Sequence, residues 1–179
     1  ENQFLLNDRK LNLRVYILMI INKGKKEIFI NRLGKCIYSN KNFDENSLDR
    51  EVHLTSLNVS NDIYDNNPFD FKDLKKFLGV NNYNALFNKI IHKCKLSLIP
   101  GIKLMGNFEK TINSLNFQLF GLDFIMNNNL EPFLLEANKG PDMIPRFDRD
   151  YKLKKEIYLD TFNIINLVPK KYNNYIKIF

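Results

Sequence analysis

Two apolar runs separated by asparagines dominate the hydrophobic pattern of residues 117–138, which read FQLFGLDFIMNNNLEPFLLEAN. The runs cover residues 117–126 and 132–137, and the asparagines stand at 127–129. A run of Asn between aromatic or β-branched segments is a turn signal. The pattern therefore predicts a β-hairpin.

The second strand of this hairpin would carry polar oxygens on one face, because side chains alternate along a strand. Folding about the asparagine turn sets Asp123 opposite Glu136 or one diagonal neighbour away. Two carboxylates so placed repel each other and lose hydration, which a hard cation such as Mg²⁺ relieves. The alternative is that both are solvated residues at strand ends. The alternation puts Leu134, Glu136 and Asn138 on one face of the strand. It puts Phe133, Leu135 and Ala137 on the other face, which is predicted to pack against the protein.

The remaining strand patterns lie in the first third of the chain. Residues 13–21 are apolar on both faces, which predicts a central strand covered on both sides. A turn at residues 22–25 should follow, and then two short strands, 27–31 and 36–39, around a turn at Arg32-Leu33-Gly34. Residues 40–50 are polar without periodicity and predict a loop, and His53 is expected in a short strand after it.

Helical patterns occupy most of the remainder. Asp70 suits the N-cap of a helix over residues 71–78 that Gly79 ends. Residues 83–96 form an amphipathic pattern with His92 on the outer face, and Pro100-Gly101 should break it before a further helix at 102–114. Apolar residues at helical spacing predict a closing helix over residues 152–167.

Composition restricts the class of protein. The chain has 179 residues, 44% of them hydrophobic, which suits one domain, residues 1–169, with a basic tail at 170–179. No apolar run reaches the length of a membrane span, and Cys36 and Cys94 lack ligand-like spacing, so we expect a soluble cytoplasmic protein with reduced thiols. The net charge of +7 favours an anionic partner. Nucleic acid is not expected, because the basic residues are scattered pairs.

Four motifs occur in order along the chain: KLNLR at residues 10–14, a turn at Arg32, HLTS at 53–56, and FGLD followed by LLEAN in the hairpin. Together they resemble the tubulin–tyrosine ligase-like family, whose members carry an ATP-grasp fold. The resemblance covers residues 1–167. It implies an α/β fold, the C-terminal portion of an ATP-grasp, in which a mostly antiparallel sheet is packed by helices.

The resemblance also implies a site for ATP and Mg²⁺. Arg14 and Glu136 would be catalytic. A structural alternative for the basic residues is ion pairing with nearby acids such as Asp8 or Glu27, and a lone histidine is more often structural than catalytic. The implied metal ligands are Asp123, Glu136 and Asn138, and the implied nucleotide contacts are Lys10, Arg14, Arg32, His53 and Thr55.

The reaction implied by the family is ATP-dependent amide-bond formation through an acylphosphate, which joins a free amino acid to a protein acceptor. Tubulin is the acceptor that the family suggests, with association with the cytoskeleton. Two alternatives stay open: a ligase for another protein, and a non-catalytic structural or binding protein that keeps the fold.

Some residues depart from the family pattern. Asn12 replaces an Asp, Ala137 replaces a Val, and Asp142-Met143 put a carboxylate into a loop expected to face the acceptor. The opening residues resemble the segment that follows the adenine-binding hinge. We therefore expect the N-terminal lobe to come from preceding residues or from a partner chain. We also expect residues 1–179 alone to bind ATP weakly and to turn over none of it.

Overall fold

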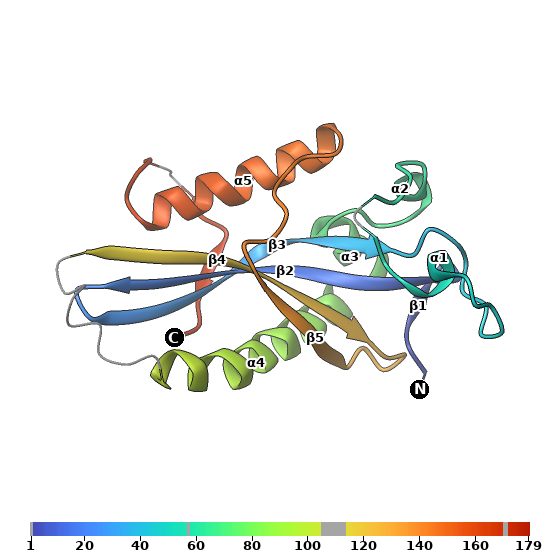
Figure 1. The fold of residues 1–179 in the computed structure, drawn as a ribbon, viewed down its shortest axis with the longest axis horizontal. Helices are drawn as coiled ribbons and strands as arrows, with labels where there is room; N and C mark the ends of the chain where they lie inside the picture. The colour runs from blue at the N-terminus through green and yellow to red at the C-terminus, as the bar shows by residue number, and fades with distance from the viewer. Residues whose placement is uncertain (1, 57, 105–113, 170–171) are drawn as a thin grey trace. The chain divides into compact units, whose positions relative to one another are not determined.

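The structure, a computed structural model, describes residues 2–56, 58–104, 114–169 and 172–179. Its described part is mixed α/β, with a six-stranded sheet in the order β5-β4-β2-β3-β6 and with β1 paired to β2 (Figure 1). The predicted fold class, a largely antiparallel sheet packed by helices, is confirmed. The strands are β1 (Leu5–Leu6), β2 (Arg9–Asn22), β3 (Lys25–Tyr38), β4 (Leu115–Met126), β5 (Pro132–Lys139) and β6 (Tyr175–Lys177). The helices are α1 (Arg50–His53), α2 (Ile63–Asn66), α3 (Phe71–Leu78), α4 (Val80–Leu104) and α5 (Asp148–Ile164).

Strand β2 lies inside the sheet, as its two apolar faces predicted. Its residues from Leu13 to Leu18 are all buried. The turn to β3 is made by Lys23 and Gly24, both at positive φ (49° and 77°). Such turns match the right-handed twist of the paired strands and join them tightly.

Strand β3 corrects one prediction, because it runs unbroken where a turn at Arg32-Leu33-Gly34 was expected. A Cβ atom at Gly34 would lie 2.4–2.6 Å from three ring carbons of Phe71. The glycine therefore allows a helix to approach the strand closely and makes no turn. The side chain of Asn31 supports the neighbouring backbone by accepting a hydrogen bond from the N–H of Leu33 (2.8 Å).

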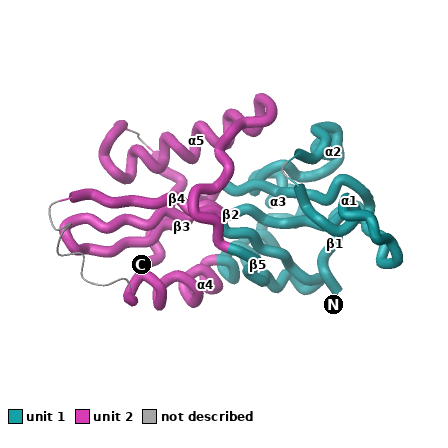
Figure 2. The backbone as a smooth tube through the Cα atoms, in the orientation of Figure 1, with its two compact units in different colours: residues 1–14, 34–90, 122–136 teal, residues 15–33, 91–121, 137–179 magenta. Residues whose placement is uncertain are grey.

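The chain divides into two compact units, each assembled from several stretches (Figure 2). Unit 1 comprises Glu1–Arg14, Gly34–Ile90 and Leu122–Glu136. Unit 2 comprises Val15–Leu33, Ile91–Gly121 and Ala137–Phe179. Long strands and helix α4 supply residues to both units.

Aromatic rings fill the core of unit 1. Tyr83 and Phe87 of α4 stack at 5.9 Å, and Phe71 of α3 meets both rings edge to face. Helix α3 begins and ends as predicted, because the Asp70 side chain accepts hydrogen bonds from two backbone N–H groups of the first turn, and Gly79 follows at φ 79°. The aromatic contacts hold α3 against α4, and the same Phe71 ring lies against Gly34 of β3.

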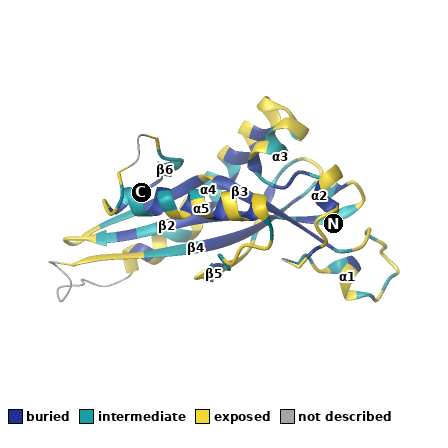
Figure 3. Ribbon diagram, turned by 90° about the horizontal axis from the view of Figure 1, so that it is seen from above, coloured by how far each residue is buried: buried dark blue, intermediate teal, exposed yellow. Residues whose placement is uncertain are grey.

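In unit 2, the hairpin of β2 and β3 lies between α5 on one face and the C-terminal half of α4 on the other (Figures 1 and 3). Leu18 and Ile20 of β2 pack with Ile165 at the end of α5. Helix α4 continues through Pro100-Gly101 to Leu104, so the predicted break is wrong. Most of the helix expected at residues 102–114 lies outside the described residues.

The C-terminal segment adds an edge strand, because β6 pairs antiparallel with β3 through Phe29↔Lys177. Lys177 also pairs with Glu27 (2.6 Å). Lys170 and Lys171 lie outside the described residues. Helix α5 begins four residues earlier than predicted, at Asp148.

None of the described helices has the length and apolar character required to cross a membrane.

Candidate functional site

The β4–β5 hairpin forms as predicted and is closed by its first asparagine. The Asn127 side-chain oxygen accepts hydrogen bonds from the N–H groups of Asn129 and Glu131, both at 3.0 Å. Leu130 has φ 54°, which a tight turn accommodates. This turn brings two carboxylates of unit 1, one on each strand, into proximity.

Asp123 on β4 is buried and is held by Arg14 of β2. The guanidinium donates from Nε to Oδ1 and from Nη2 to Oδ2 (2.8 Å). The two side chains are only 7% and 6% exposed. A two-point contact of this kind orients both groups and is stronger than a neutral hydrogen bond.

Glu136 on β5 reaches the same carboxylate. Burial raises the pKa of Asp123, the Arg14 guanidinium lowers it, and hydrogen bonding and charge repulsion from Glu136 raise it again, with a net rise. The prediction that the hairpin brings Asp123 and Glu136 together is therefore confirmed. The Arg14 guanidinium and these two carboxyl groups form one cluster, in which a cation would favour the ionised form of both carboxyl groups.

The donor set suits a hard cation. Each carboxylate oxygen has a second lone pair, so Asp123 can accept from Arg14 and still bind a metal ion. Glu136 is exposed and open to solvent. Mg²⁺ typically takes one or two protein carboxylates and fills its other positions with water or phosphate oxygens. Within the described residues no group of three or more His, Cys, Asp or Glu side chains could hold a metal ion.

Asn138 lies two residues beyond Glu136 on the same strand and is half-buried, but it belongs to unit 2. The opposite face of β5 differs from the prediction. Phe133 and Leu135, expected to pack, are 47% and 51% exposed. This face of the strand is therefore more exposed than its apolar side chains predicted.

A second cluster in unit 1 joins Lys10 and His53. The Lys10 ammonium lies 3.3 Å from Nδ1 of His53 and 4.9 Å from the centre of the Phe43 ring. Nε2 of His53 lies 2.6 Å from the Ser47 carbonyl oxygen, which assigns the ring proton to Nε2 and leaves Nδ1 to accept from Lys10. The neighbouring polar loop thus fixes both side chains.

His53 does not stand in a strand, as the sequence had suggested. It is the last residue of the short helix α1, which begins because the Asp49 side chain caps the N–H of Glu51. Thr55 follows in an isolated antiparallel bridge with Ser39. Both remain in unit 1, the unit of Arg14.

Arg32 lies in unit 2 within β3, and its side chain is exposed. Its backbone N–H donates to the Asn174 carbonyl (2.9 Å). The structure therefore brings together Arg14, Asp123 and Glu136, and separately Lys10 and His53. Arg32 and Asn138 belong to unit 2.

Sequence reasoning missed the partner of Arg14. It weighed Asp8 and Glu27, but Glu27 pairs with Lys25 (2.9 Å) and Lys177. The sequence did contain a signal for a buried partner. An arginine on a strand that is buried on both faces loses its hydration, and this free-energy cost has to be offset by an anion. Asp123 is that anion.

The sequence of this chain is similar to that of known proteins. The family model for the "Tubulin-tyrosine ligase family" matches residues 1–175. Similar relatives include a "Probable tubulin polyglutamylase TTLL9" of Mus musculus, 30% identical over 93% of this chain and 37% of the relative. A "Tubulin glycylase 3B" of Drosophila melanogaster is 23% identical over 95% of this chain and 24% of its own length.

The human "Tubulin polyglutamylase TTLL6" is 25% identical over 92% of this chain and 20% of its own. The chain thus spans 37% of the length of its mouse relative and a smaller share of the other two. The family match nevertheless covers nearly every residue of the chain. The chain belongs to the tubulin–tyrosine ligase family.

Proposed function

We propose that this chain carries the metal- and phosphate-binding part of an ATP- and Mg²⁺-dependent ligase that joins an amino acid to a protein acceptor, with tubulin as that acceptor. The observation that carries the proposal is the cluster of Arg14, Asp123 and Glu136 in unit 1. The names of the relatives support tubulin as the substrate. Because they include polyglutamylases and a glycylase, the proposal is for the ligase class and covers more than one amino acid.

In this proposal the carboxylates of Asp123 and Glu136 hold Mg²⁺, and Asn138 adds a neutral oxygen ligand. ATP would supply the phosphoryl group that activates a carboxylate. Such reactions depend on positioning and on neutralising phosphate charge more than on a protein nucleophile. A site built from two carboxylates and cationic side chains suits that requirement.

Arg14 has two tasks in this proposal. Its two-point contact with Asp123 fixes the buried carboxylate in one orientation. Its cationic charge also favours phosphate at the cluster. Lys10, which is held by His53, supplies a further ammonium group in the same unit.

The roles of Arg32, His53 and Thr55 at the nucleotide are part of the same proposal, although the three residues have different support. His53 and Thr55 share unit 1 with the carboxylates, whereas Arg32 is exposed in unit 2. A protein acting on tubulin would work beside the cytoskeleton.

The experiment is a ligation assay with the polypeptide that contains this chain, Mg-ATP, tubulin and radiolabelled glutamate or glycine. Glu136→Gln should abolish labelling of tubulin while circular dichroism shows an unchanged fold. Glu156→Gln, which changes a partly buried glutamate of α5 outside the cluster, should keep it. Full labelling by the Glu136 variant would exclude this residue from the site, and absence of labelling by the unaltered protein would favour a non-catalytic role.

A further inference from the structure

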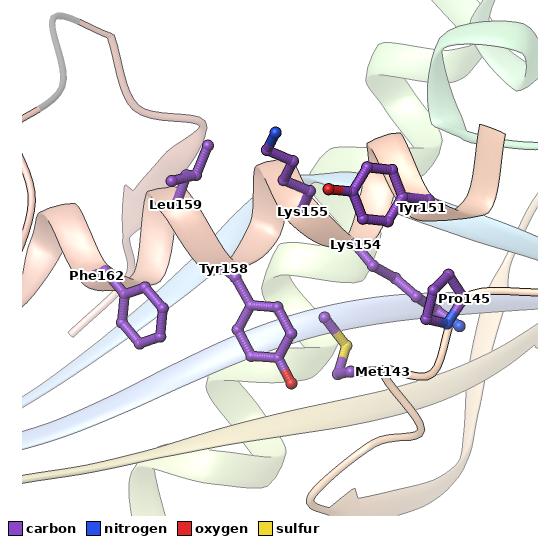
Figure 4. A pocket seen from close by; sticks show the side chains of 8 residues that line it. All are labelled: Met143, Pro145, Tyr151, Lys154, Lys155, Tyr158, Leu159 and Phe162. Carbon is purple, nitrogen blue, oxygen red and sulfur yellow. The ribbon is translucent and has the colours of Figure 1, made fainter. Parts of the chain in front are cut away.

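A groove in unit 2 is lined by one side of α5 and by the loop after β5 (Figure 4). Its volume is about 360 Å³. Side chains spaced four apart form neighbouring rows on a helix surface. The two rows that line the groove are Tyr151, Lys155 and Leu159, and Lys154, Tyr158 and Phe162.

Aromatic rings give the groove stiff walls. Tyr158 and Phe162 stack with their centres 5.9 Å apart and their planes at 16°. Tyr151 and Tyr158 are 50% and 40% exposed. Exposed tyrosines that already hold fixed positions lose little entropy when a partner covers them, so this surface is suited to binding.

The far wall of the groove comes from the loop after β5, through Met143 and Pro145 (Figure 4). This loop is tied to α5 by the buried pair Asp150 and Lys154. Lys154 Nζ donates to Asp150 (2.8 Å) and to the carbonyl of Ile144 (2.7 Å). The groove is therefore already formed without a bound partner.

The charges select the kind of partner. Among the described residues that line the groove, the two charged ones are both lysines and none is acidic. Asp150 neutralises Lys154, whereas Lys155 is exposed, with its ammonium 5.6 Å from the centre of the Tyr151 ring. An apolar groove with a cationic rim complements a segment that carries both an apolar side chain and carboxylates.

The loop that walls the groove begins at Gly140, two residues after Asn138 and directly after the end of β5, and both Asn138 and the loop belong to unit 2. We infer that the α5 groove binds an acidic peptide segment of the protein acceptor, with an aromatic or large aliphatic side chain of that segment in the groove and its carboxylates beside Lys155. This inference rests on the proposed function for its link to catalysis. The ability of the groove to bind an acidic peptide does not depend on that link.

The probe is a fluorescein-labelled peptide of ten glutamates interrupted by one central phenylalanine, titrated with the 179-residue chain at low ionic strength and without nucleotide. Tyr158→Ala should weaken binding about tenfold, because it removes an aromatic wall of the groove; a tenfold change corresponds to about 1.4 kcal/mol. Tyr158→Phe should bind within about twofold of the original, because it keeps the ring and its apolar area.

Matched charge changes test the contribution of Lys155 at the edge of the groove. Lys155→Glu should weaken the acidic peptide about fivefold or more, and added salt should reduce the difference. Lys152→Glu makes the same change on the same helix at an exposed residue outside the groove, and should have less than about a twofold effect. A peptide with alanine in place of phenylalanine should bind as weakly as the Tyr158→Ala chain binds the original.

If Lys155→Glu and Lys152→Glu lose the same affinity for the peptide, the net charge of the chain alone explains the effect and the inference is wrong. A concentration-dependent dimer that Tyr158→Ala dissociates would instead assign the groove to a second copy. The Glu136→Gln chain should bind the peptide normally. If it does so while its polypeptide keeps full ligation activity, the proposed catalytic site is wrong and the groove stands. If no peptide binds although Glu136→Gln abolishes ligation, the groove inference alone is wrong.

Discussion

Replacing Arg14 by Met should destabilise the chain by about 3–5 kcal/mol, because it leaves the Asp123 carboxylate buried without its cation. The magnitude follows from the geometry: both side chains are more than nine-tenths buried and share two hydrogen bonds. The exposed pair of Lys89 and Glu131 (3.1 Å) is the matched control, and Lys89→Met should cost less than about 1 kcal/mol.

A double variant measures the interaction energy between Arg14 and Asp123 separately from the effects of their surroundings. Arg14→Met combined with Asp123→Leu removes both charges, and replacing a whole buried ion pair by apolar groups is often close to neutral. The double variant should therefore recover most of the loss, with a coupling energy of roughly 2 kcal/mol or more in the double-mutant cycle. The assay is urea unfolding followed by circular dichroism, with a chelator present. A loss below about 1 kcal/mol for Arg14→Met would refute the conclusion that the pair is buried.

Two further changes test the packing of unit 1 in the same unfolding assay. Gly34→Ala should destabilise by about 1–3 kcal/mol, because the new methyl group would overlap the buried ring of Phe71. Gly101→Ala in α4 meets no atom within 4 Å and should instead stabilise by roughly 0.5–1 kcal/mol, so equal effects at the two glycines would contradict the close approach. Asp70→Ala should cost about 0.5–2 kcal/mol, because two backbone N–H groups of α3 lose their acceptor, whereas Asp70→Asn should keep most of the cap. A neutral result for Asp70→Ala would show that the cap is not needed.

The sequence predicted the candidate site best where the interaction is local. The asparagine turn and the alternation of the strands sufficed to bring Asp123 and Glu136 together, since a hairpin joins neighbours along the chain. The pairing of Arg14 with Asp123 was not predicted. It depends on β2 lying beside β4, and strand order across a sheet is not encoded in local periodicity.

Glycine and proline were misread for related reasons. Gly34 suggested a turn, but a glycine also serves where another group approaches the backbone closely, and a single sequence does not distinguish these uses. Pro100-Gly101 suggested the end of a helix, yet α4 continues, because packing of a long helix can outweigh the loss of one hydrogen bond. The buried residues Leu86, Ile90, Cys94 and Ile102 show that α4 is packed on both sides of that position.

The open face of β5 was also missed. Alternation shows which side chains share a face, but it does not show whether another element covers that face. Phe133 and Leu135 are apolar and exposed together. Their burial therefore could not be inferred from apolar character alone.

Paramagnetic broadening can test the claim that Asp123 and Glu136 hold a divalent cation. Mn²⁺ binds the same oxygen ligands as Mg²⁺, so small additions to the isotope-labelled chain should broaden amide resonances around Asp123 and Glu136 first. Glu136→Gln should abolish this selective broadening, whereas Glu51→Gln, at an exposed acid paired with Lys41, should leave it unchanged. Broadening that persists in the Glu136 variant, or that begins near Glu51, would contradict the claim.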